Sequence, residues 1–307
     1  MRLRIAVHFV VSFIAALPLF AQVTLTGAGA TFPAPIYQKW FNEYQSIGNV
    51  QINYQPIGSG GGIKNVTEGV VDFGASDGPM TDAQIKEFKQ KRGFGILQFP
   101  TVLGAAVPTY NVPGVNQLNF TPEILAGIFL GNIKKWNDPT IVQANPGLKL
   151  PDLNILVAHR AEASGTTYCW TDYLSKVSPE WKAKVGTNTS VNWPTGVGGK
   201  TNDGVAGIIK QQPGAIGYVE LIYAIKSHLA YGKVKNKAGK LIKADLGSVS
   251  AAAAGVKMPD DFRVSITDAA GATAYPISTF TWLLIPEKIS DPEKKKAIVG
   301  FLKWAIT

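Results

Sequence analysis

The sequence is poor in the residues that form covalent cross-links and metal centres. It contains one cysteine, Cys169, and three histidines among 307 residues. A single cysteine cannot form an internal disulfide, and no group of His, Cys and carboxylate residues has the spacing of a metal site. We therefore predict a protein without a bound metal or cofactor, in which Cys169 is a buried and inert thiol.

Long apolar runs are also lacking after the first residues of the chain. Arg2 and Arg4 precede an apolar stretch from Ile5 to Phe20, and Ala21 follows it. A basic start, an apolar segment and a small residue at its end are typical of a secretory signal peptide, and the stretch is short for a membrane span. We predict that residues 1–21 are a signal peptide and that the mature chain is periplasmic.

Positive charge is in excess but it is not concentrated. The formal net charge is +9, and Lys294–Lys296 is the one run of lysines. A nucleic-acid surface would need the charge gathered in a patch or stripe. Scattered lysines instead indicate solubility and a mild attraction for anions, so no nucleic-acid partner is predicted.

The length and the apolar pattern predict two domains of the α/β class. A chain of 307 residues is longer than one core usually serves. Strand-like stretches at Val23–Leu25, Val50–Tyr54 and Val71–Asp77 alternate with amphipathic helical stretches. This alternation predicts a parallel sheet with right-handed crossovers, in which ligands bind beyond the carboxyl ends of the strands, at helix starts.

Three loops occupy such positions, namely Thr31–Phe32, Ser59–Gly62 and Ser164–Thr167. Each is rich in Gly, Ser or Thr and lies between a predicted strand and a predicted helix. Hydroxyls, backbone N–H groups and the positive end of a helix suit a compact oxyanion, and Arg160 would add a guanidinium fork. A flexible glycine connection and an ordinary capped helix beside a surface arginine remain the alternatives.

Asp77 narrows the choice of anion. An ionised carboxylate accepts hydrogen bonds but cannot donate them, so it can face only an anion that carries a proton. Hydrogen phosphate has such a proton and sulfate at neutral pH has none, which predicts discrimination between the two. The alternative is that Asp77 is a turn residue before Gly78-Pro79. Catalysis has less support, because a Ser164 nucleophile needs a base and His159 lies across the loop.

Six stretches resemble, in the same order, those of the periplasmic phosphate-binding proteins of high-affinity phosphate ABC transporters. They are Leu25–Pro35, Ile57–Lys64, Val71–Asp77, Arg160–Thr167, Gly198–Val205 and Pro213–Glu220. The resemblance implies a type II periplasmic binding protein, with two α/β domains, a hinge and a ligand cleft between them. Domain I would comprise residues 22–101 plus 266–307, and domain II residues 102–265.

The resemblance also implies a function and a set of site residues. The protein would be a monomer, not an enzyme, that captures phosphate in a closing cleft and delivers it to an inner-membrane ABC permease. The implied phosphate-binding residues are Thr31, Phe32, Ser59, Asp77, Arg160, Ser164, Gly165 and Thr166. Phe32 and Gly165 would act through backbone N–H groups, and Asp77 would accept the phosphate proton.

The sequence departs from the family pattern at two places. The family has an aspartate two residues after the arginine, which braces it. This chain has Glu162 there, which either braces Arg160 in the same way or, with its extra methylene, leaves it looser. Family members usually continue past the equivalent of Trp304, so the chain is expected to end early. The competing hypotheses are a receptor for another tetrahedral oxyanion, such as sulfate or molybdate, a secreted phosphatase using Ser59 or Ser164, and a surface adhesin or scaffold.

Overall fold

The computed structural model describes residues 22–305. The predicted signal peptide and the predicted early end of the chain lie outside these residues. The strands are β1 Val23–Gly29, β2 Val50–Gln55, β3 Phe73–Ser76, β4 Ile96–Tyr110, β5 Asn119–Phe120, β6 Leu156–Arg160, β7 Val197–Gly199, β8 Ala215–Glu220, β9 Ala230–Tyr231, β10 Lys233–Lys235, β11 Leu241–Ile242 and β12 Ser278–Pro286. The helices are α1 Ala34–Gly48, α2 Ser59–Glu68, α3 Asp82–Arg92, α4 Pro122–Phe129, α5 Pro139–Ala144, α6 Gly165–Val177, α7 Pro179–Lys184, α8 Thr201–Gln211, α9 Leu221–Lys226, α10 Leu246–Ala254 and α11 Pro292–Ala305.

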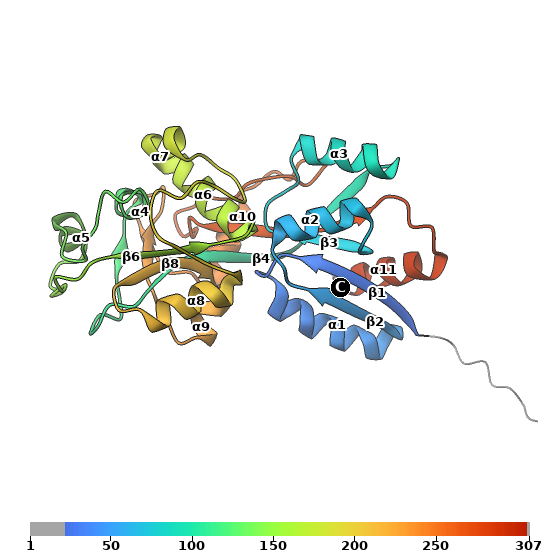
Figure 1. The fold of residues 1–307 in the computed structure, drawn as a ribbon, viewed down its shortest axis with the longest axis horizontal. Helices are drawn as coiled ribbons and strands as arrows, with labels where there is room; N and C mark the ends of the chain where they lie inside the picture. The colour runs from blue at the N-terminus through green and yellow to red at the C-terminus, as the bar shows by residue number, and fades with distance from the viewer. Residues whose placement is uncertain (1–21, 306–307) are drawn as a thin grey trace, which may run out of the picture.

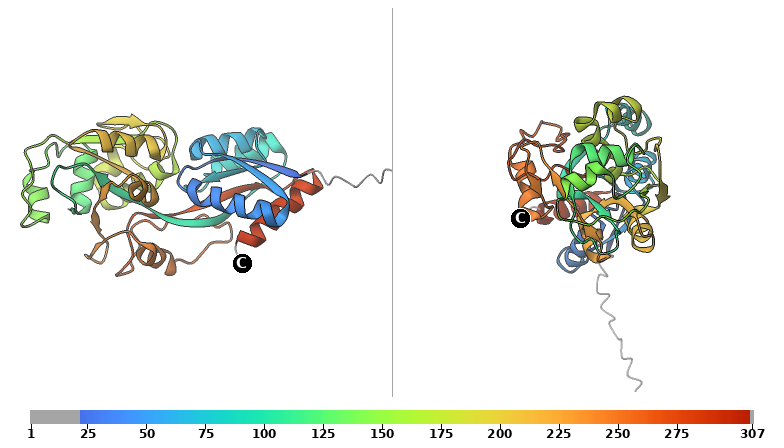
Figure 2. Two further views of the ribbon diagram at one scale, coloured as in Figure 1. Left: turned by 90° about the horizontal axis from the view of Figure 1, so that it is seen from below. Right: turned by 90° about the vertical axis from the view of Figure 1, so that its left-hand side faces the viewer.

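The elements form two lobes that lie side by side along the longest axis of the molecule (Figure 1). The first lobe contains β1, β2 and β3 with α1, α2, α3 and α11, and the second contains β6, β7 and β8 with α4 to α9. One sheet runs through both lobes in the order β2-β1-β3-β12-β4-β8-β6-β7. The long strand β4 extends from one lobe into the other, as Figure 2 shows.

Strand direction differs between the outside and the centre of this sheet. β1 is parallel to β2 and β3, and β6 is parallel to β7 and β8. At the centre, β12 is antiparallel to β3 and β4, and β4 is antiparallel to β8. The predicted parallel sheet is therefore correct for β1, β2 and β3 and for β6, β7 and β8, and wrong for β4 and β12. The reason is that β4 carries the chain into the second lobe and β12 carries it back, so these neighbours run in opposite directions.

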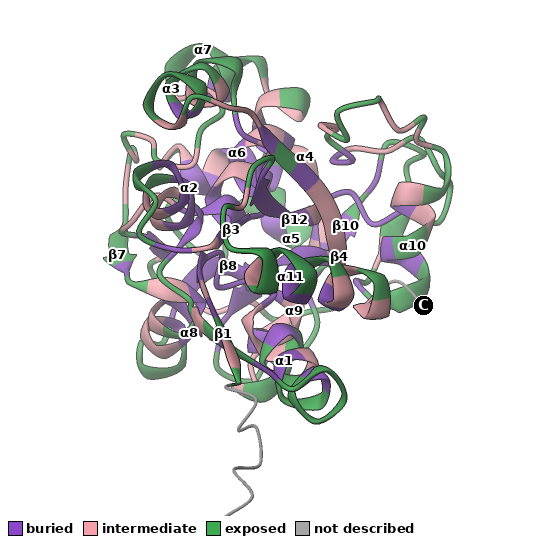
Figure 3. Cartoon of the chain, turned by 90° about the vertical axis from the view of Figure 1, so that its right-hand side faces the viewer, coloured by how far each residue is buried: buried purple, intermediate pink, exposed green. Residues whose placement is uncertain are grey.

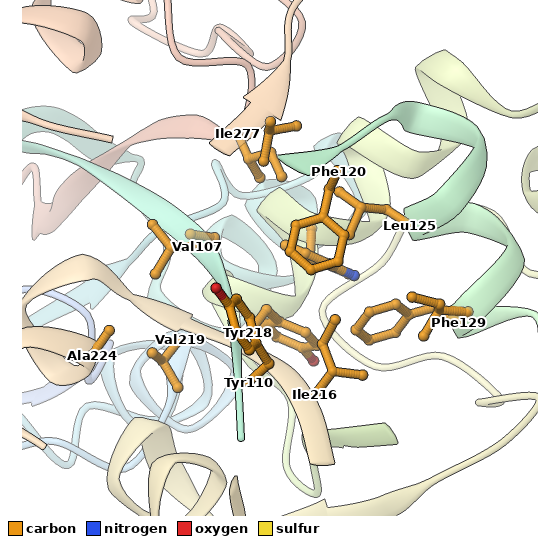
Figure 4. Packing of buried hydrophobic residues seen from close by; sticks show 14 of the residues in the cluster. Val107, Tyr110, Phe120, Leu125, Phe129, Ile216, Tyr218, Val219, Ala224 and Ile277 are labelled. Atoms are coloured by element: carbon orange, nitrogen blue, oxygen red, sulfur yellow. The ribbon is translucent and has the colours of Figure 1, made fainter. Parts of the chain in front are cut away.

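Each lobe has its own apolar core. In the second lobe, one cluster joins β4, β8 and α4 through residues such as Val107, Phe129 and Tyr218 (Figure 4). In the first lobe, Leu283 and Leu284 belong to different clusters on the two faces of the sheet. Successive strand side chains point to opposite faces, so one strand contributes to both layers. Figure 3 shows that the buried residues gather on the strands and the inward helix faces.

Helix starts follow the capping signals of the sequence. Thr81 caps α3 in a capping box with Gln84, and Thr121 accepts a hydrogen bond from the N–H of Ile124 at the start of α4. Ser164 caps α6 by accepting from the N–H of Thr167 at 3.2 Å. These local bonds fix where α3, α4 and α6 begin.

Candidate functional site

The three glycine-, serine- and threonine-rich loops meet at the junction of the lobes. Thr31 follows β1, Ser59 is the first residue of α2, and Ser164 precedes α6; α2 and α6 lie on either side of the junction (Figure 1). The N–H of Gly165 donates to Ser59 Oγ at 3.0 Å across it. All eight residues predicted to bind the anion are buried: Thr31, Phe32, Ser59, Asp77, Arg160, Ser164, Gly165 and Thr166.

The two lobes touch closely at Gly165. A Cβ at this position would lie 2.4 Å from Ser59 Oγ and 2.6 Å from Asp77 Oδ2. A second contact joins the N–H of Gly60 to the carbonyl oxygen of Ala163 at 3.0 Å. Only a residue without a Cβ permits this approach, which explains why glycine stands at the first position of α6.

The hydroxyl groups are polarised by the bonds that they accept. Ser59 Oγ accepts from the N–H groups of Asp77 and Gly165, at 3.2 and 3.0 Å. Thr166 Oγ1 accepts from Arg160 Nη1 at 3.2 Å and from Asn202 Nδ2 at 3.4 Å. A hydroxyl has two acceptor lone pairs and one proton. Both lone pairs of these oxygens are engaged, so the protons of Ser59 and Thr166 remain to be donated.

Arg160 ends β6 and is held in place by Glu162. Arg160 Nε donates to Glu162 Oε1 at 2.9 Å, and Nη2 donates to the same oxygen. With the bond from Nη1 to Thr166, three of the five guanidinium N–H groups are engaged, which leaves one on each terminal nitrogen. Glu162 thus contacts Arg160 in spite of its extra methylene, which is the first of the two alternatives that the sequence leaves open. Its Oε1 also accepts from the N–H of Thr201 at 3.0 Å.

Asp77 is a buried carboxyl group with one oxygen engaged. Its Oδ1 accepts from the Thr281 hydroxyl at 2.7 Å, and its carbonyl oxygen accepts from the Thr279 hydroxyl at 2.9 Å. Burial raises the pKa of Asp77 to about 7, and the hydrogen bond from Thr281 and the charge of Arg160 oppose this rise. The other oxygen, Oδ2, lies toward Gly165 and the start of α6.

Sequence reasoning missed residues that complete the site. Asn202 Nδ2 donates to Thr31 Oγ1 at 2.8 Å, and the Tyr223 hydroxyl donates to the Thr31 carbonyl oxygen at 2.6 Å. Asn202 stands in a stretch that reads only as a helix start, although this stretch belongs to one of the six family-like segments. Thr281 lies 204 residues after Asp77, and no local signal connects the two.

The site offers many hydrogen-bond donors and little net charge. Arg160 is paired with Glu162, and Asp77 contributes a second carboxyl group. An anion held here would therefore depend on hydroxyl and N–H dipoles and on the starts of α2 and α6 rather than on a cage of cations. Among residues 22–305 there is no group of His, Cys, Asp and Glu suited to a metal, and no helix able to cross a membrane.

The serines of the site lack the surroundings of a nucleophile. Ser59 Oγ and Ser164 Oγ are bonded to backbone N–H groups. The ring of His159 stacks on Trp193 at a centroid distance of 4.7 Å, and its Nδ1 contacts the carbonyl oxygen of Arg160. Burial lowers the pKa of His159. Within the part of the chain that the structure describes, neither serine is bonded to a histidine, and the Ser59 hydroxyl interacts with the Asp77 carboxyl group. Cys169 is buried, and burial raises the pKa of its thiol.

Comparison with known proteins places the chain in a family. A model of the PBP superfamily domain matches residues 20–307. The phosphate-binding protein PstS of Xylella fastidiosa is 44% identical over 287 residues, which cover 92% of this chain and 77% of the relative. The chain belongs to the PstS family. The PstS protein of Methanocaldococcus jannaschii is 42% identical over 310 residues, with coverage of 94% and 79%.

Solved structures confirm the predicted binding-protein fold of this PstS-family chain. The phosphate-binding protein from Stenotrophomonas maltophilia matches with a TM-score of 0.74 at 21% identity, covering 93% of this chain and 84% of that one. A phosphate ABC transporter substrate-binding protein from Clostridium perfringens matches with a TM-score of 0.65 at 18% identity, with coverage of 91% and 92%. At these identities the likeness concerns the fold alone.

Proposed function

We propose that this PstS-family protein captures inorganic phosphate, as hydrogen phosphate, between its two lobes and delivers it to an ABC permease. Its PstS relatives are named phosphate-binding proteins. The observation that carries the proposal is the position of the buried Asp77 carboxyl group beside polarised hydroxyl donors and Arg160. One acceptor among many donors matches an oxyanion that has one proton and several bare oxygens.

The proposed ligands are the eight residues that the sequence indicates. Ser59 and Thr166 donate their hydroxyl protons, and Arg160 donates its two remaining N–H groups. Thr31, Phe32 and Ser164 complete the shell from the starts of α1 and α6, and Gly165 would share with the anion the N–H that donates to Ser59 Oγ in this structure. Asp77 accepts the phosphate proton with Oδ2, the oxygen that Thr281 leaves unoccupied.

Hydrogen bonds to charged groups contribute about 1.5–3 kcal/mol each, so eight would exceed the roughly 8 kcal/mol of a micromolar Kd. The surplus offsets dehydration of the anion and the cost of ordering two lobes around it. Such binding requires the lobes to open for entry and close for capture. We propose that β4 and β12, two strands that run between the lobe cores, form the hinge.

The two cores also suggest where the domains divide. Tyr275 and Ile277 pack in the core of the second lobe, although they follow residue 266. Leu283 and Ile285 pack in the first lobe. We therefore propose domain I as residues 22–101 plus 278–305, with the second boundary at the start of β12 rather than at residue 266.

Asp77→Asn tests the proposed function. The amide can donate to a bare anion oxygen, so phosphate-over-sulfate selectivity should fall by at least roughly 100-fold from the 10⁴–10⁵ that such a site can reach. Calorimetry with each anion measures the ratio. Asp72→Asn is the matched control, because Asp72 lies in the same lobe and bonds Thr26 and Lys294 away from the junction. Unchanged selectivity in Asp77→Asn would contradict the role of proton acceptor.

The competing functions have direct tests. A receptor for sulfate or molybdate would bind that anion more tightly than phosphate in the same calorimetric experiment. A secreted phosphatase would release nitrophenol from nitrophenyl phosphate without added metal. Periplasmic export rests on the predicted signal peptide, and mass spectrometry of the exported protein would reveal cleavage near Ala21 if it is correct.

A further inference from the structure

We infer that Asn202 is a positioning residue for anion capture, because its amide fixes the direction of two threonine hydroxyls, one from each lobe. The inference rests on the proposed phosphate-binding function. Asn202 is fully buried at the start of α8. Its Nδ2 lies 2.8 Å from Thr31 Oγ1 in the first lobe and 3.4 Å from Thr166 Oγ1 in the second.

The backbone determines which end of the Asn202 amide faces the hydroxyls. Asn202 Oδ1 accepts a hydrogen bond from the N–H of Glu220 at 3.0 Å. A backbone N–H can only donate, so the oxygen of the amide must face Glu220 and the NH₂ group must face the threonines. The orientation of the amide is thereby set by the end of β8.

The orientation of the Asn202 amide determines the hydrogen-bonding role of the Thr31 and Thr166 hydroxyls. An amide NH₂ group can only donate, so Thr31 Oγ1 and Thr166 Oγ1 must both accept from Asn202. Each threonine then keeps its own proton for another acceptor. The chain of bonds therefore runs in one direction, from the Glu220 N–H through Asn202 to the hydroxyls, and from the hydroxyls to the anion. Hydrogen bonds in such a chain polarise and strengthen one another.

The backbone before Asn202 is held in a conformation that favours this role. Thr201 has a φ of 65°, a region that β-branched residues rarely occupy. Its N–H donates to Glu162 Oε1, the same oxygen that holds Arg160. Strained residues of this kind persist where surrounding contacts fix them. Glu162 thus positions both the arginine and the start of the helix that presents Asn202.

The bond to Thr31 also gives Asn202 a part in closure. Thr31 belongs to the first lobe and Asn202 to the second, so the bond between them exists only while the lobes are together. The Thr31 hydroxyl is oriented by this bond, so it contributes to anion binding in the closed state and not in the open state. Substitution of Asn202 should therefore accelerate phosphate release more than it slows capture.

Asn202→Asp is the decisive variant because it preserves shape and reverses polarity. A carboxylate accepts only, so both threonine protons would turn toward it and away from the anion. Loss of two hydrogen bonds to a charged ligand should weaken phosphate binding roughly 100-fold or more. The matched control is Asn236→Asp. Asn236 is also a buried amide, whose Nδ2 donates to carbonyl groups and whose Oδ1 accepts from the N–H of Lys240, far from the junction.

Calorimetry gives the affinities and stopped-flow release gives the dissociation rates. We expect Asn236→Asp to lower thermal stability while leaving phosphate affinity within about twofold, since it touches no proposed ligand. Asn202→Ala provides a second variant without a buried charge, and we expect it to weaken binding about tenfold, because it frees the hydroxyls without reversing them. Asn202→Asp or Asn202→Ala with wild-type affinity would overturn the inference.

A double-mutant cycle separates positioning from a general structural role. If Asn202 acts through Thr166, the effect of Asn202→Ala should shrink by at least about threefold in a Thr166→Val background. Purely additive effects would overturn the inference. Failure of the wild-type protein to bind phosphate would instead contradict the proposed function, so the two failures are distinguishable.

Discussion

Replacing Gly165 with alanine is the most direct test of closure at the junction. The new Cβ would lie 2.4 Å from Ser59 Oγ, whereas ordinary contacts begin at 3.4 Å. The start of α6 cannot easily move away, because the N–H of Ser164 donates to the Thr189 carbonyl oxygen and Ser164 Oγ caps the helix. The lobes must therefore separate by about 1 Å to admit the methyl group.

That separation breaks the bonds between the lobes. The 3.0 Å bonds from Gly165 to Ser59 and from Gly60 to Ala163 would lengthen to about 4 Å, beyond hydrogen-bonding range. The bond from Asn202 to Thr31 would weaken with them. At about 0.5–1.5 kcal/mol each, these three losses amount to roughly 1.5–4.5 kcal/mol, which is about 10- to 2,000-fold in phosphate affinity.

Calorimetry measures the affinity, and small-angle scattering measures compaction on addition of phosphate. Gly207→Ala is the control, because a Cβ at this position of α8 meets nothing within 4 Å and should stabilise the helix slightly. The unfolding free energy of ligand-free Gly165→Ala should stay near the wild-type value, since opened lobes accommodate the methyl group. Wild-type phosphate affinity in Gly165→Ala would refute the reasoning.

Further predictions concern Asp77 and Arg160. Thr281→Val removes the hydroxyl that favours the ionised form of Asp77, so the pKa of Asp77 should rise above about 7. Phosphate-over-sulfate selectivity at pH 7 should then fall. A ratio of phosphate to sulfate affinity equal to that of the wild type, measured by calorimetry, would contradict this. The pKa of Asp77 in the folded protein exceeds its ordinary value, so the contribution of Asp77 to the unfolding free energy of the ligand-free protein should be greatest below pH 4 and decline as pH rises through 7. Asp77→Asn should remove that decline, which amounts to roughly 2–3 kcal/mol between pH 5 and pH 8, in denaturation experiments at these two pH values. An unaltered dependence of the unfolding free energy on pH would count against it. Arg160→Ala should weaken phosphate binding by about 2–5 kcal/mol in calorimetry, because two free N–H groups are lost and Glu162 loses its partner; wild-type affinity would exclude Arg160 from the site.

The sequence by itself determined the parts of the site that depend on neighbouring residues. Ser164 caps α6 because its hydroxyl reaches an N–H three residues ahead, and the same local rule places Thr81 at the start of α3. The glycine-, serine- and threonine-rich loops lie between a strand and a helix, where their positions can also be read from neighbouring residues. The likeness of six ordered segments to one transporter family was visible as well, and the family is confirmed.

Tertiary structure alone decided how these parts act together. Asn202 meets Thr31 across 171 residues, and Thr281 meets Asp77 across 204. No periodicity or capping signal predicts either contact. The first depends on how the two lobes are aligned, and the second depends on the pairing of β12 with β3 inside the first lobe. The directions of β4 and β12, and the direction of the hydroxyl protons, follow from that alignment. The sequence therefore indicates which chemical groups line the candidate site, and the fold determines which of them can donate a hydrogen bond there.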